Sequence, residues 1–142
     1  IVRTNPGQPA KPLNKVASGG ELSRISLAIQ VACAAKTNVA TLVFDEVDVG
    51  IGGGVAQIVG QLLRELGHHN QVMCVTHLPQ VAAQGHTHLH VNKQTSKNQT
   101  HTDIAKLSQD EKVAEIARML GGLKISEQTL AHARELIEES QA

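Results

Sequence analysis

The chain has 142 residues, about the length of a single domain. Its 41% hydrophobic and 18% charged residues exclude an intrinsically disordered protein. Thirteen Lys and Arg residues balance thirteen Asp and Glu residues, which argues against a nucleic-acid module that works by bulk positive charge. Phe44 is the only aromatic residue, so base stacking is almost excluded as a binding mode.

The first 17 residues predict an irregular lead-in segment, because three of the four prolines lie between Asn5 and Pro12. Residues 18–142 are expected to form the folded lobe. Since the chain starts at Ile1 and not at Met, we expect a segment of a longer protein, with a processed or tagged chain as the alternative. We find no signal peptide and no run of ~18 apolar residues, and therefore expect a cytoplasmic protein without membrane contact.

The first part of the lobe predicts two buried strands joined by a helix. A helix is expected over 21–36. Its apolar face is formed by Leu22, Ile25, Ile29 and Ala32–Cys33, and Leu27 and Val31 widen this stripe. The apolar run Thr41–Phe44 is typical of a strand buried on both faces of a parallel sheet. Further along the chain, the sequence predicts a loop at 50–54, a helix at 55–66, a second buried strand at 71–76 and a short helix at 78–83.

The second part predicts a hairpin and two helices. Residues 86–93 and 100–107 alternate between apolar and polar side chains, which favours a β-hairpin that extends the sheet at one edge. Residues 109–120 and 126–139 follow a helical period and are separated by two glycines. The order of the elements therefore predicts an α/β fold with a parallel sheet, flanking helices and an edge hairpin.

The two cysteines, Cys33 and Cys74, lie within apolar runs. Buried free thiols in a reducing cytoplasm are the favoured interpretation, and a disulfide or a metal pair is the alternative.

Two glycines and a capping pattern mark the start of the first helix. Ser18 is a candidate N-cap, and Glu21 completes a capping box. Gly19 and Gly20 let a phosphate approach the backbone closely, and a helix N-terminus offers free N–H groups to an anion. An ordinary capped helix is the alternative.

Two carboxylates follow the first predicted strand. Asp45 and Glu46 would lie at the carboxyl end of a parallel strand, where ligands bind in open α/β sheets. Asp45 is suited to hold Mg²⁺ directly or through water, and Glu46 to activate a water molecule as general base. A solvated acidic strand end is the alternative. The same loop continues to Asp48.

His77 follows the second predicted strand, so neighbouring parallel strands would bring it beside Glu46. An imidazole there is suited to contact a terminal phosphate, with a structural histidine as the alternative. The histidines at 86, 88 and 90 would share one strand face, but no cysteine or carboxylate has complementary spacing, so a metal site there is disfavoured.

Four motifs in this order resemble those of ABC-type ATPases. Residues 18–24 (SGGELSR) resemble the signature motif, 41–46 (TLVFDE) the Walker B motif, and 47–50 (VDVG) the D-loop. His77 resembles the switch histidine. The forms of 44–53 (FDEVDVGIGG), 76–82 (THLPQVA) and 116–122 (IARMLGG) are similar to a DNA repair member of the SMC-like branch of this family.

The resemblance implies an ATP site shared between two heads of a homodimer. Asp45 would hold Mg²⁺, Glu46 would activate water, and His77 would contact the γ-phosphate. Ser18, Gly19 and Gly20, with Glu21 beside them, would bind the nucleotide of the opposite head. Asp48 would lie at the contact between heads. Arg24 is a further candidate for a structural or DNA-sensing role, with a surface arginine as the alternative.

One motif of the family is missing. A phosphate-cradling loop has the pattern Gly-x-x-x-x-Gly-Lys-[Ser/Thr], and this chain has no Gly-Lys pair and no long heptad run. In the family those parts precede the signature motif. The resemblance therefore implies an N-terminal Walker A half as partner, DNA contact through the full-length protein, a nucleoid-associated location, and no ATPase activity of the chain by itself.

The resemblance leaves competing classes open. The alternatives are a head fragment of another SMC-like chromosome or recombination ATPase, a transporter ATPase subunit, and a non-catalytic interaction module in which Asp45 and Glu46 are incidental.

Overall fold

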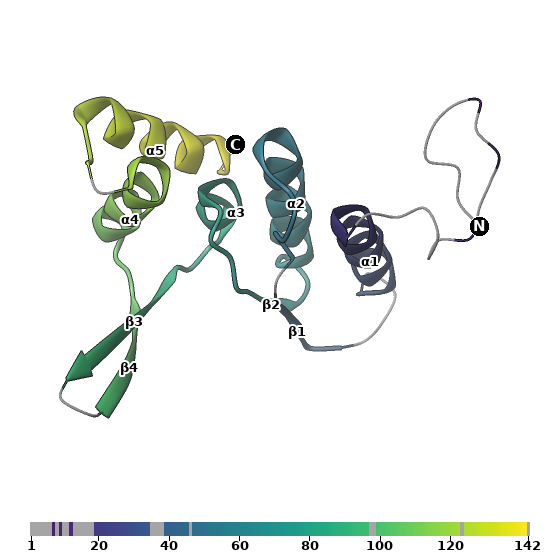
Figure 1. Cartoon of the computed structure of the whole chain (residues 1–142), viewed down its shortest axis with the longest axis horizontal. Coiled ribbons are helices and arrows are strands. Elements are labelled where there is room, and N and C mark those ends of the chain that lie inside the picture. The colour runs from purple at the N-terminus through teal and green to yellow at the C-terminus, as the bar shows by residue number, and fades with distance from the viewer. Residues whose placement is uncertain are drawn as a thin grey trace.

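The computed structural model describes residues 7, 9, 12, 19–34, 39–45, 47–96, 99–122 and 124–141, without side-chain placement for 19–24, 30, 34, 96 and 99. The lead-in segment lies almost entirely outside the described residues. Figure 1 shows the elements in order, namely α1 (Gly19–Ala34), β1 (Thr41–Phe44), α2 (Gly53–Leu66), β2 (Gln71–Cys74), α3 (Pro79–Gln84), β3 (Leu89–Ser96), β4 (Gln99–Lys106), α4 (Gln109–Gly121) and α5 (Glu127–Glu139).

The α/β prediction is confirmed by the first four elements. β1 and β2 pair in parallel, with Thr41 opposite Gln71 and Phe44 opposite Cys74. α2 connects the two strands, as the crossover of a βαβ unit requires. The parallel arrangement brings the carboxyl ends of both strands to the same edge of the sheet.

The prediction that both strands are buried on both faces is wrong for this chain. Val43, Met73 and Val75 are 66%, 50% and 61% exposed. On the opposite face, Phe44 is buried, and Leu42 and Val72 pack against the same core. The apolar runs predicted strands with both faces covered by other elements. Within the described residues, only the face that carries Phe44 is covered.

The hairpin is confirmed, but its predicted place at the edge of the sheet is wrong. β3 and β4 pair antiparallel, with Leu89 opposite Lys106 and Val91 opposite Ile104. Among the described residues they form a separate two-stranded sheet. The hairpin projects away from the helices (Figure 1), and the side chains of Leu89, Val91 and Ile104 are exposed.

The predicted apolar face of α1 is confirmed in part. Leu27 is buried and Val31 packs against the same core, as predicted. Ile29 and Cys33, also predicted on this face, are exposed. Cys33 and Cys74 are both free thiols, as predicted, but Cys33 is not buried and Cys74 is only half-buried. Among the α1 side chains that the structure describes, Leu27 is buried against the core that includes α2, with Val31 packed beside it.

The buried side chains that the structure describes form two separate clusters. The sheet-side core lies between the sheet, α1 and α2, and the helical core between α3, α4 and α5. The sheet-side core consists of Leu27, Phe44, Val47, Ala56, Val59, Leu63, Leu66 and Val81. The helical core consists of Ala83, Ile116, Ala117, Ala133 and Ile137.

α3 joins the two cores. It contributes Val81 to the first and Ala83 to the second. The last carbonyl groups of a helix have no partner within it, and here they accept hydrogen bonds from side chains of three other segments. Arg64 donates to Gln84 O at 2.6 Å, Lys112 Nζ to Ala83 O at 3.0 Å and to Gly85 O at 2.6 Å, and Ser140 Oγ to Ala83 O at 3.2 Å.

The surface of the chain is large for its mass. Its solvent-accessible area is 9877 Å², whereas a compact protein of this size has about 7,000 Å². The uncovered sheet face and the projecting hairpin contribute to the difference, because large apolar side chains are exposed on both.

Candidate functional site

The candidate site lies where β1 and β2 end. Asp45 follows directly after β1 and is exposed, and Thr76 and His77 follow β2. Between β1 and α2 the chain turns at 47–50, where Ile51 N–H donates to Asp48 O at 3.3 Å and Gly50 has a φ of 73°. This turn directs the Asp48 side chain back toward the end of β2.

Asp48 is the buried centre of the site. Its side chain is 3% exposed. Oδ2 accepts hydrogen bonds from Thr76 Oγ1 at 2.6 Å and from the backbone N–H of His77 at 2.9 Å. Burial by itself raises the pKa of this carboxyl, but these hydrogen bonds and the neighbouring His77 outweigh it and lower the pKa below its ordinary value. Asp48 is therefore a buried carboxylate.

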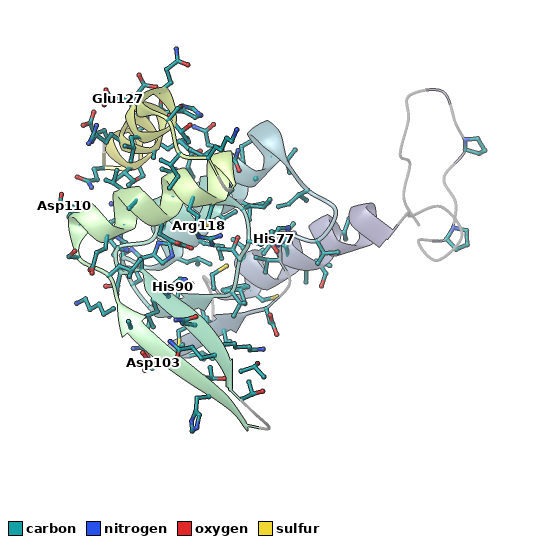
Figure 2. The ribbon with its side chains drawn as sticks, turned by 60° about the vertical axis from the view of Figure 1, so that its left-hand side comes forward. His77, His90, Asp103, Asp110, Arg118 and Glu127 are labelled. Carbon is teal, nitrogen blue, oxygen red and sulfur yellow. The ribbon has the colours of Figure 1, made fainter. Side chains whose placement is uncertain are left out.

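His77 is held at this carboxylate by one side of its ring. Its Nδ1 lies 3.1 Å from Asp48 Oδ2, whereas the side chain as a whole is 72% exposed. Figure 2 shows His77 well apart from the hairpin residue Asp103. Thr76 Oγ1 also accepts from the N–H of Leu78 at 3.0 Å, which fixes the entry into α3. His77 is thus anchored at its backbone and open to solvent at its ring.

The Cys74 thiol lies close to both carboxylates of this edge. Burial, with the negative charges of Asp48 and Asp45, raises the pKa of Cys74 to about 11. The thiol is therefore neutral at physiological pH, and we assign it no role as nucleophile or metal ligand.

Two of the predicted site residues, Ser18 and Glu46, lie outside the described residues. Gly19, Gly20 and Glu21 form the first turn of α1. The predicted neighbourhood of His77 and Glu46 thus stays a prediction, and in the described part of the site His77 is joined to Asp48. The sequence did single out Asp48, but nothing in the local pattern pairs it with a residue 29 positions away.

The described residues contain no group of three or more His, Cys, Asp or Glu that could hold a metal ion. The disfavoured metal site at 86, 88 and 90 stays a prediction. A carboxylate does lie close to this strand face, since His90 Nε2 is 3.9 Å from Glu115 Oε1 of α4. In Figure 2, His90 and Arg118 lie on the same side of the molecule, and Arg118 also pairs with Glu115, at 2.7 Å.

Comparisons with known proteins agree with this architecture. The chain is 60% identical over 137 residues to the DNA repair protein RecN of Vibrio cholerae, and 45% identical over 140 residues to that of Bacillus subtilis. These matches cover 96% and 99% of the chain, but only 25% and 24% of the relatives. The chain thus spans about a quarter of the length of the relatives it matches. No family model matches it.

A solved structure shares the fold. It comes from work on the structural biochemistry of ATP-driven dimerization and DNA stimulated activation of SMC ATPases, and it is 21% identical to this chain with a TM-score of 0.64. The match covers 83% of this chain and 70% of that one. Among the described residues, no helix is both long and apolar enough to span a membrane.

Proposed function

Because this chain corresponds to a segment of the RecN family of DNA repair proteins, we propose that it forms the part of an ATP-hydrolysing head that carries the signature, Walker B, D-loop and switch-histidine motifs. The observation that supports this best is the arrangement at one edge of the parallel sheet. Asp45, Asp48 and His77 come from the ends of two adjacent strands, which is where open α/β sheets bind ligands.

The residues present suit ATP with Mg²⁺. Asp45 offers an exposed carboxylate and is the proposed protein ligand. Mg²⁺ prefers oxygen ligands and is commonly held by one or two carboxylates together with phosphate oxygens and waters. The exposed carboxylate of Asp45 fits that donor set, whereas the Asp48 carboxylate is buried and already hydrogen-bonded. The bound ion would neutralise charge on the phosphates.

The remaining groups position the reaction. Glu46 is the proposed general base for the attacking water, and the exposed ring of His77 the proposed contact for the γ-phosphate. Phosphoryl transfer needs positioning and charge neutralisation more than covalent chemistry. These two residues, with Asp45, would supply both for the nucleotide of their own head.

The opposite nucleotide would be bound by the start of α1. Ser18, Gly19 and Gly20 are the proposed contacts, with Glu21 in the same turn. A helix N-terminus suits this role because its N–H groups and dipole favour a phosphate. The turn at 47–50, which holds Asp48, is the proposed contact between heads. ATP would then join two copies, and hydrolysis would release them.

The exposed apolar surface supports a missing half-head as the first partner. One face of the sheet leaves Val43, Met73 and Val75 uncovered. α2 exposes a second apolar stripe, Val55, Ile58 and Leu62, at positions i, i+3 and i+7 of one helical face. Apolar patches of this kind mark interaction surfaces. We propose that a lobe with the Walker A loop covers them in the longer protein.

The biological role would be repair of double-strand breaks by recombination, in the cytoplasm and associated with the nucleoid. The neutral charge of this segment points to DNA contact through the assembled protein and its phosphate contacts, not through a base-reading element of this chain.

A chimera tests the proposal directly. This chain would replace the matching region of the Vibrio cholerae relative, and Mg²⁺-dependent ATP turnover would be measured with and without DNA. We expect turnover by the chimera and none by the chain alone. The chimera with Asp103→Asn, a substitution on the exposed hairpin, is the matched control and should keep its turnover. Turnover by the chain alone would contradict the half-head assignment.

Two variants of the chimera separate the roles. Glu46→Gln should bind ATP, lose turnover and accumulate joined heads, which size-exclusion chromatography with ATP would detect. Ser18→Arg should abolish both turnover and head pairing but leave nucleotide binding to the monomer intact. Fast turnover in the first variant would exclude Glu46 as the base, and unchanged turnover in the second would exclude the signature assignment.

A further inference from the structure

The Asp48 side chain is committed to contacts within its own chain, although the resemblance assigns this residue to the contact between heads. Three partners converge on Oδ2, namely Thr76 Oγ1 at 2.6 Å, the His77 N–H at 2.9 Å and His77 Nδ1 at 3.1 Å. All belong to the segment that follows β2. The carboxylate therefore acts on the placement of His77.

We propose that Asp48 is a positioning residue that keeps a proton on His77 Nδ1 and leaves Nε2 as the ring nitrogen that faces a ligand. This inference rests on the proposed function, which assigns the γ-phosphate to His77. It adds a role for Asp48 inside one head, which does not require the second copy.

The two neighbours of the His77 ring, the Asp48 carboxylate and the proposed γ-phosphate, determine which ring nitrogens carry a proton. Asp48 Oδ2 is a carboxylate oxygen and only accepts hydrogen bonds, so an unprotonated Nδ1 at 3.1 Å would set two lone pairs against each other. A γ-phosphate oxygen also only accepts, so Nε2 must carry a proton to bind it. A ring with both nitrogens protonated is the imidazolium cation. Asp48 thus keeps Nδ1 as a donor to its own carboxylate and leaves Nε2 as the nitrogen for the phosphate.

The surroundings contain no competing anion within reach of this ring among the described residues. Asp48 is the only carboxylate at ion-pair distance from His77 in that part of the chain. Among the described residues, two other titratable groups lie at this edge of the sheet. They are the exposed Asp45 carboxylate and the Cys74 thiol, which is neutral because burial and nearby negative charge raise its pKa to about 11. The buried position of Asp48 shields the contact from salt, because buried pairs are screened less than exposed ones.

Nitrogen NMR of the histidine rings tests the inference without any nucleotide. The chain labelled with ¹⁵N at its histidines would be observed at alkaline pH, and a His77→Gln variant would identify the signals of His77. We expect Nδ1 to give the shift of a protonated nitrogen and Nε2 that of an unprotonated one. The opposite assignment would overturn the inference. Asp48→Asn should reduce the population with the proton on Nδ1, whereas Asp103→Asn should leave it unchanged.

Turnover of the chimera tests the consequence for the reaction. Asp48→Asn should lower kcat/KM by about tenfold, the size expected when a charge-assisted contact is removed. A loss of turnover in Asp48→Asn with an unaltered ring tautomer of His77 would show a merely structural role and overturn the inference.

The two hypotheses fail in different ways. If His77→Gln turns over ATP at the unchanged rate, the proposed function of His77 is wrong. If His77→Gln loses turnover while Asp48→Asn leaves the ring tautomer unaltered, the proposed function stands and the role of Asp48 is wrong.

Discussion

The two cores of this chain differ in how completely they are covered. The helical core is enclosed by α3, α4 and α5, and Ile116, Ala117 and Ala133 are fully buried there. The sheet-side core is covered on one face only, and Val43 and Met73 point to solvent from the other. The candidate site belongs to the incomplete core. The helical core is thus enclosed within the chain, whereas one face of the sheet beside the sheet-side core is exposed.

The ends of the helices explain part of this difference. α4 begins with a capping box, in which Ser108 Oγ accepts from the Glu111 N–H and Glu111 Oε2 accepts from the Ser108 N–H at 2.8 Å. α5 begins with Ser126, whose Oγ accepts from the Thr129 N–H at 3.1 Å. Local contacts therefore define these helices without help from another chain.

The largest expected effect comes from the helical core. Ile116→Ala should lower the free energy of unfolding of the chain by about 3 kcal/mol, because it leaves a cavity at a fully buried position. Urea unfolding followed by circular dichroism at 222 nm would measure it. Val43→Ala on the uncovered sheet face is the matched control, with a change within about 0.5 kcal/mol. Equal losses in both variants would contradict the contrast between the cores.

A second test removes the polar link between the cores. Lys112 is buried and donates to the carbonyls of Ala83 and Gly85, and burial together with the charge of Arg64 lowers its pKa. Lys112→Met should cost about 2 kcal/mol, because Gly85 O loses its donor. The exposed hairpin variant Lys106→Met should cost almost nothing in the same urea experiment. An unchanged free energy of unfolding in Lys112→Met would show that this polar link does not contribute to stability.

A third test concerns the close packing of α2 against α3 at Gly60. A Cβ at Gly60 would lie 2.7 Å from Gln84 Cγ and 3.1 Å from Gln80 O. Overpacking here costs about 2 kcal/mol, and the better helix propensity of alanine returns about 1 kcal/mol, so Gly60→Ala should lose about 1 kcal/mol. Gly54→Ala in the same helix meets nothing within 4 Å and should be neutral or slightly stabilising. Thermal unfolding of both variants would measure this difference, and equal stability of the two would contradict the close packing at Gly60.

The smallest expected effect is a pH dependence on the hairpin side. Burial lowers the pKa of His86 and His88 below the ordinary 6.5, so the unfolded chain binds more protons there. Stability should therefore fall as the pH drops from about 6.5 through the folded-state pKa values. His88→Gln should flatten this slope, and the exposed hairpin variant His101→Gln should not. Urea unfolding between pH 5 and 7 would measure the dependence of stability on pH. The same dependence in His88→Gln and in the unmodified chain would contradict this prediction.

The sequence predicted the elements well because their signals are local. The parallel pair, the hairpin and both C-terminal helices follow from apolar periodicity, and Ser108 and Gly122 mark the ends of α4 through their own backbone and side-chain contacts. The uncovered sheet face was not predictable. An apolar residue such as Val43 indicates that its position is to be covered, but not by which chain.

The same distinction holds for the candidate site. The carboxyl ends of β1 and β2 were predictable because parallel pairing brings them to one edge, as the register confirms. The contact of Asp48 with His77 was not, because it depends on a turn that reverses the side chain into the protein and on partners far apart in sequence. The roles of Ser18 and Glu46 stay predictions.

The placement of α3 has a consequence for cooperativity. Because one side chain of this short helix belongs to each core, the two halves of the chain cannot open independently while α3 is folded. Amide protons of α3, such as the Val81 and Ala82 N–H groups that donate to Leu78 O, should exchange with deuterium only when both cores open together. Hairpin amides should exchange far earlier. A helix of six residues would then set the size of the unit that unfolds.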